Sequence, residues 1–241
     1  MRALLRYSIL IYLTNSHYLL PLVCILVYCG FLYTLIPLGI SECFAVSVTI
    51  LFAVSLLDGF FSYKVWNHDM RAILVLKTGS AVKYYGSNEI LLALLAVVYA
   101  VMIFLYPGIV FGSAAAGEAG HLSAYELIAL LALHLFVALC GYEIGSLFQP
   151  DMMGRRIPVA LLFSGTILGI FLRNELSMVP IIKYVFWIFP PIAKVLQLLH
   201  TEETFCSAEI RHIVGHLGLY TLLLLAGKWF LLSRRKWAVY E

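Results

Sequence analysis

The sequence predicts an all-α polytopic membrane protein with six transmembrane helices. Of the 241 residues, 63% are hydrophobic and only 12% are charged, and the mean hydropathy is +0.96. Soluble domains have roughly half apolar residues and about a quarter charged ones. A chain of this length cannot hide so much apolar side chain in one soluble core. We therefore expect a single transmembrane domain over 1–241.

Residues 1–15 are predicted to form an interfacial helix. Arg2 and Arg6 lie one helical turn apart, with leucine and isoleucine side chains largely away from them. This pattern suits a helix in the inner membrane interface whose arginines approach lipid phosphates. The alternative is that these residues begin the first span. The charge-free run 7–41 is too long for one straight span, since a bilayer core needs roughly 20 residues. A break in this run leaves a first span at 17–37.

The later spans follow from the remaining apolar runs. Between spans two and three, a cytoplasmic segment at 64–89 has a middle that suits a short surface helix. Between spans five and six, an outer region at 173–212 contains Pro180, Pro190 and Pro191. Such broken helices need protein or water to satisfy their free backbone groups, so we expect short interfacial or re-entrant helices there. The other five spans are expected at 43–62, 90–112, 124–148, 157–172 and 213–232.

Basic residues predict the orientation of these spans. With the N-terminus inside, eleven lysines and arginines lie in inner segments and four in the outer region. An excess of positive charge marks cytoplasmic segments. We therefore expect both termini in the cytoplasm and a multi-pass protein of a plasma membrane, that of a bacterium.

Motifs for covalent chemistry are absent from the sequence. It contains no P-loop, no GxSxG, no HExxH and no cysteine or histidine spacing typical of a metal site. We therefore expect no catalytic residue, no metal and no cofactor in this chain, and we expect it not to be an enzyme by itself. Membrane lipid is an expected partner and nucleic acid is not.

A few polar residues lie within the predicted spans. Asp58, Glu143 and Lys228 fall near inner ends of spans, and intramembrane charges usually face the bundle interior or water. Glu143 and Lys228 are able to pair, or to reach the interface separately. His134, in the middle of span four, is better explained as a hydrogen-bonded packing residue than as a proton carrier. The small residues of 141–145 favour a close approach between helices.

Three stretches and the overall layout suggest a family. Asp69-Met-Arg-Ala-Ile-Leu-Val-Leu-Lys-Thr-Gly79 and Tyr84-Tyr-Gly-Ser-Asn-Glu89 are similar to the charged segment before span three of ABC type-2 exporter permeases. Gly141-Tyr-Glu-Ile-Gly-Ser-Leu-Phe148 resembles the close of span four in that family. An interfacial helix, six spans and a cytoplasmic helix after span two complete the resemblance.

The resemblance implies a transporter driven by other chains. It implies two copies of a separate ABC ATPase subunit, which hold the ATP and magnesium, and a second permease chain in a homodimer. A secondary cytoplasmic contact with the ATPase is expected at Asp151, Arg155 and Arg156. The main contact, the coupling helix, is expected to use Trp66, Asp69, Met70, Arg71, Leu74 and Lys77.

The expected substrate is hydrophobic or amphipathic, and a membrane-active peptide such as a toxin or bacteriocin fits best. Candidate residues of its path are Tyr28, Phe31 and Phe52, although an aromatic stripe is more often a packing face. Two other functions stay open. A secondary transporter would need intramembrane acids and inverted repeats, and a non-transporting scaffold or sensor would need no ATPase.

Overall fold

The computed structural model describes residues 2–35, 40–62, 68–111, 124–149, 163–170, 172, 190–201 and 207–234. All regular secondary structure in these ranges is helical, which confirms the predicted all-α class. Residues 163–170 are also helical. The main helices are α1 (Arg2–Thr14), α2 (Leu19–Leu35), α3 (Ile40–Phe61), α4 (His68–Thr78), α5 (Ala81–Phe111), α7 (Ala124–Leu147), α11 (Ile192–Thr201) and α12 (Ser207–Arg234).

Four of the described helices are long and apolar enough to cross a membrane. Their apolar segments are Glu42–Phe61, Val82–Tyr106, Ala124–Leu147 and Glu209–Leu232. Helices α1 and α2, bent by 61° at residues 15–18, pass the same test as a pair and raise the number to five. These helices support a multi-pass transmembrane protein. Of the sixth expected span, 157–172, only 163–170 and 172 are described.

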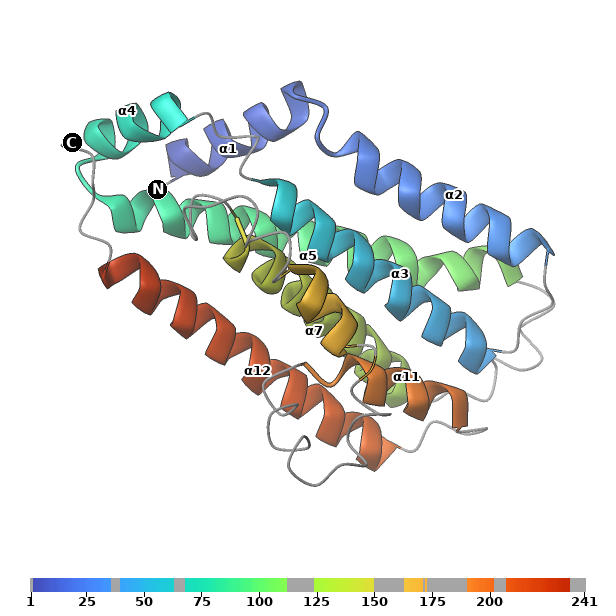
Figure 1. Cartoon of the computed structure of the whole chain (residues 1–241). Helices are drawn as coiled ribbons and strands as arrows, with labels where there is room; N and C mark the ends of the chain where they lie inside the picture. Colours follow the sequence, from blue (N-terminus) through green and yellow to red (C-terminus); the bar gives the residue numbers. More distant parts are fainter. Residues whose placement is uncertain are drawn as a thin grey trace.

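Helix α7 lies at the centre of the bundle and packs against α3, α5 and α12 (Figure 1). One core cluster joins α3 and α7 to α11 and α12 and includes Phe52, Leu133 and Leu217. A second cluster joins α1, α2, α3 and α5 and includes Ile25 and Ile103. The central position of α7 explains why its side chains are buried around most of its circumference near its C-terminal end.

Glycines set the distance between α3 and α7. A Cβ atom on Gly145 would lie 2.1 Å from the carbonyl oxygen of Leu56, and one on Gly141 would lie 3.0 Å from that of Phe52. On the facing helix, a Cβ on Gly59 would lie 2.6 Å from the carbonyl oxygen of Tyr142. The backbones therefore touch directly, which confirms the close helix approach predicted from 141–145.

Helices α7 and α12 run parallel in register. The Arg211 guanidinium lies over the Tyr125 ring, 5.8 Å from its centroid. Seven residues further along α12 and eleven further along α7, a Cβ on Gly218 would contact the Phe136 ring at 3.4 Å. Because both helices advance in the same direction, their C-termini lie at the same end of the bundle.

We call this end the α4 end: α3, α7 and α12 finish there, α5 begins there, and α1 and α4 lie beside it (Figure 1). Helix α11 lies toward the opposite end and packs against α3. Gly79, with a φ of 62°, closes α4 and turns the chain into α5. Helix α5 begins at Ala81, nine residues before the expected start of span three, so Lys83 to Glu89 are helical.

Candidate functional site

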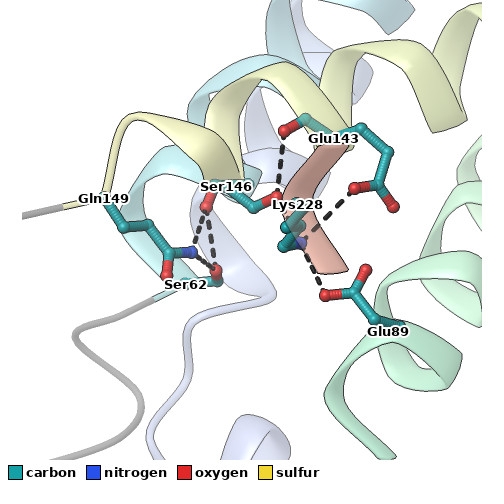
Figure 2. A network of polar contacts seen from close by, with 7 residues as sticks. Ser62, Glu89, Glu143, Ser146, Gln149 and Lys228 are labelled. Carbon is teal, nitrogen blue, oxygen red and sulfur yellow. Dashed lines mark hydrogen bonds and ion pairs between the residues drawn. The ribbon is translucent and has the colours of Figure 1, made fainter. Parts of the chain in front are cut away.

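A lysine cluster, consisting of Glu89, Glu143, Ser146 and Lys228, joins α5, α7 and α12 at the α4 end (Figure 2). Lys228 Nζ lies 2.5 Å from Glu89 Oε1, 3.4 Å from Glu143 Oε2 and 2.6 Å from Ser146 Oγ. The side chains of Lys228, Glu89 and Glu143 are only 4%, 12% and 8% exposed. The cluster therefore holds three ionisable groups away from solvent.

The geometry of the cluster uses every donor of the lysine. An ammonium group has three N–H donors, and the three oxygen atoms around Lys228 accept one each. Ser146 in turn donates its own proton to the backbone carbonyl of Glu143, one helical turn earlier, at 3.0 Å. One carboxylate oxygen, Glu89 Oε2, is buried without a hydrogen-bond partner among the described residues. Two carboxylates thus face one cation.

A neighbouring contact ties the ends of α3 and α7 together. Gln149 Nε2 donates to the carbonyl oxygen of Gly59 at 2.9 Å and to Ser62 Oγ at 2.6 Å (Figure 2). Ser62 also donates to the Gly59 carbonyl, at 2.8 Å. The α3–α7 contact made by the glycines therefore continues to the last residues of both helices.

A second group, the tyrosine cluster, consists of Tyr12, Asp58, Tyr99 and Tyr142. The hydroxyls of Tyr12 and Tyr142 both donate to Asp58 Oδ2, at 2.9 and 2.8 Å. Because the single proton of Tyr12 goes to Asp58, the contact of 3.3 Å between Tyr12 and Tyr99 has Tyr99 as its donor. All four side chains are buried. The cluster thereby attaches α1 to α3, α5 and α7.

His134 is fully buried in the middle of α7. Its Nδ1 lies 2.8 Å from the carbonyl oxygen of Leu130 and its Nε2 lies 2.7 Å from Ser47 Oγ. The rings of Phe44 and Phe104 contact it edge-on. Both ring nitrogens are therefore occupied, as expected of a packing residue.

Helix α4 packs on α5 at the α4 end. Leu74 faces the core, whereas Lys77 is exposed and the apolar side chains of Ile73 and Leu76 are 56% and 63% exposed. Asp69, Met70 and Arg71 belong to α4, but their side chains are not among those described. Trp66 lies outside the described residues.

The other expected site residues are not brought together. Phe52 is buried in the α3–α7 core, Tyr28 is half-buried on α2, and Phe31 is exposed there. Asp151, Arg155 and Arg156 lie outside the described residues. Among the described residues, no group of three histidine, cysteine, aspartate or glutamate side chains is arranged to hold a metal ion.

Both polar clusters contain residues that sequence reasoning did not connect. Glu89 was expected in the cytoplasmic segment before span three, and Tyr12 on an interfacial helix. One sequence signal could have placed Glu89 on the helix of span three: residues 81–90 contain no proline. Their only glycine, Gly86, does not end the helix. No sequence signal links Tyr12 to Asp58, because the two residues are 46 positions apart.

These features define the chain as an all-helical, multi-pass membrane protein with buried polar clusters at one end. Comparison with protein-family models, curated proteins and solved structures finds no match to the chain. Its function must be argued from the helices and clusters themselves.

Proposed function

We propose that the chain is the permease subunit of an ATP-driven exporter and that a separate ATPase subunit binds α4. The observation that carries the proposal is the exposed apolar pair Ile73 and Leu76 on a short helix at one end of a transmembrane bundle. An exposed apolar pair on a helix outside the spans is typical of a contact with a protein partner, which would cover it.

Helix α4 is joined to the spans in a way that suits transmission of force. Two residues connect it to α5. Its last turn is closed by two hydrogen bonds, from the Thr78 hydroxyl to the carbonyl oxygen of Leu74 and from the Gly79 amide to that of Leu76. Leu74 packs into the cluster that contains α1, α3 and α5. A displacement of α4 therefore acts on the beginning of α5 and through it on the bundle.

The direction of the helices is compatible with six spans. Helix α7 ends at the α4 end, whereas α12 begins at the opposite end, so the chain between them has to cover the length of the bundle. The helical residues 163–170 contribute Phe163 and Ile170 to the core shared with α3 and α7. These contacts support the proposal of a fifth span at 157–172, and with six spans both termini would lie on the side of α4.

The substrate we propose is a hydrophobic or amphipathic molecule, with a membrane-active peptide as the best candidate. The faces of α2 and α12 that do not pack inward carry leucine, valine and phenylalanine, whereas the buried charged residues described in the spans, Asp58, Glu143 and Lys228, belong to the two clusters. A route beside such faces suits an apolar guest better than a sugar or an ion. The active unit would contain two permease chains and two ATPase chains.

The test is co-expression of the chain with a P-loop ATPase encoded beside it. We expect the two proteins to purify together and the ATPase rate to rise when both are reconstituted with a peptide substrate. Replacing Ile73 and Leu76 together by serine should remove the binding and the stimulation. Reversing the charges of Asp69 and Arg71 should weaken them.

The matched control is Val82→Ser, which removes a side chain that is 64% exposed on α5 rather than on α4. It should leave ATPase binding unchanged. Equal binding by the Ile73/Leu76 variant and the wild type would exclude α4 as the ATPase contact. Substrate movement driven by a pH gradient without any ATPase would instead identify a secondary transporter.

A further inference from the structure

We propose that the lysine cluster is a proton-binding site, in which Glu89 and Glu143 share one proton beside a charged Lys228. This inference concerns the isolated chain and does not depend on an ATPase partner.

The lysine cluster contains more acidic than basic groups. Lys228 is the one cation that pairs with either carboxylate in the part of the chain that the structure describes. With both acids ionised, the cluster has a net charge of minus one. A buried charge is costly unless another charge balances it, and two carboxylates around one site cannot both ionise easily. One added proton makes the cluster neutral.

The hydrogen bonds of the cluster leave one carboxylate oxygen without a donor. Lys228 has no donor left, because Glu89 Oε1, Glu143 Oε2 and Ser146 Oγ take all three. Glu89 Oε2 is left buried with no partner among the described residues. An ionised oxygen in that position loses its hydration and gains nothing in return. A proton on Glu89 neutralises this carboxyl group and removes the cost of an unpaired ionised oxygen.

Other titratable groups near the cluster do not supply the missing charge. Cys140 lies one turn before Glu143 on α7 and is a neutral thiol when buried. On α3, Asp58 is engaged by the hydroxyls of Tyr12 and Tyr142. Neither α3 nor α7 therefore provides a second described cation to the cluster.

The bound proton makes the position of α5 depend on pH. If Glu89 moves away from Lys228 into water, Glu143 and Lys228 remain as a neutral pair and Glu89 ionises. The shared proton then leaves for the solvent. A conformation that separates α5 from α12 at the α4 end is therefore favoured as the pH rises.

Infrared spectroscopy of the purified full chain in lipid vesicles tests the proposal. A protonated carboxyl group has a carbonyl stretch that is separate from that of a carboxylate, and isotopically labelled glutamate distinguishes it from any aspartate signal. We expect one protonated glutamate at neutral pH in the wild type. Glu89→Gln and Glu143→Gln should each abolish the signal, since one acid then pairs with one lysine.

Lys228→Met should change the signal in the opposite direction. Without the ammonium, both acids need a proton, so the glutamate signal should roughly double. Asp58→Asn is the control and should leave the labelled signal unchanged. Absence of a protonated glutamate in the wild type at neutral pH would overturn the proposal, and so would a signal that survives in both glutamine variants.

Discussion

Lys228 Nζ lies 3.4 Å from Glu143 Oε2, although the two residues are 85 positions apart in the chain. Each residue stands in the last two turns of its helix, α12 or α7. Together with the contact between Arg211 and Tyr125 near the other ends, this pair fixes both the direction and the axial position of α12. The polar cluster therefore determines where the last helix lies against the bundle.

Lys228→Met is expected to destabilise the protein by about 3–5 kcal/mol at neutral pH, because it leaves two buried acids without a cation. The folded variant then binds more protons than the unfolded chain, so its stability falls as the pH rises and recovers as the pH falls. Unfolding curves in mild detergent across a pH series measure this. Lys194→Met, at an exposed position of α11, serves as the control. A loss independent of pH would contradict the charge argument.

Gly145→Ala is expected to destabilise the protein by roughly 1–3 kcal/mol, since its Cβ would lie 2.1 Å from the carbonyl oxygen of Leu56 and force α3 and α7 apart. Gly227→Ala on α12, where nothing lies within 4 Å of the new atom, should be neutral or stabilising by up to about 1 kcal/mol. Thermal unfolding of the two purified variants compares them. Equal unfolding temperatures would show that the helices are not held at backbone contact.

Tyr12→Phe should loosen the attachment of α1, because the hydroxyl that donates to Asp58 and accepts from Tyr99 is lost. The buried Ser8, replaced by cysteine in a chain without Cys24 and Cys206, reports the change through its rate of maleimide labelling. We expect the labelling rate to be several-fold higher than in the parent that keeps Tyr12. The free energy of local opening of α1 should fall by an amount on the order of 1–2 kcal/mol.

Thr14→Val provides the comparison for this variant. The Thr14 hydroxyl bonds only to carbonyl oxygens of its own helix, those of Leu10 and Ile11. Its loss should leave the labelling rate of the cysteine unchanged. The same acceleration in both variants would mean that the tyrosine cluster does not hold α1.

Gln149→Glu should cost more stability than Gln149→Met. Both changes remove the amide that donates to the Gly59 carbonyl and Ser62 Oγ. The methionine variant should lose about 1 kcal/mol, because Ser62 still donates to that carbonyl. The glutamate adds a carboxylate facing a carbonyl oxygen and should lose roughly 2–3 kcal/mol. Chemical unfolding of both variants measures the difference, and the opposite order would contradict the assigned donor.

The sequence predicts the helices well because each is encoded locally. Apolar runs long enough for a bilayer mark α3, α5, α7 and α12, and all four are found. Glycines at 141 and 145 predict a close helix contact because only small residues permit one. Such signals depend on neighbouring residues alone.

The partners of the polar residues could not be predicted in the same way. The pairing of Glu143 with Lys228 was one of two outcomes that the sequence left open, because similar depth in the membrane does not decide which helices are neighbours. Charge is typical of the end of a span, so the sequence predicts a loop at Glu89. Tyr12 meets Asp58 only through tertiary packing of α1.

The lysine cluster also has a consequence for biosynthesis. Glu89 and Glu143 enter the membrane with α5 and α7, before the ribosome has made α12 and its Lys228. Until then, the two acids in the growing chain lack the cation that balances their charge in the finished bundle. A chain cut short before α12 would therefore carry two acids within its spans whose charge no lysine of α12 balances.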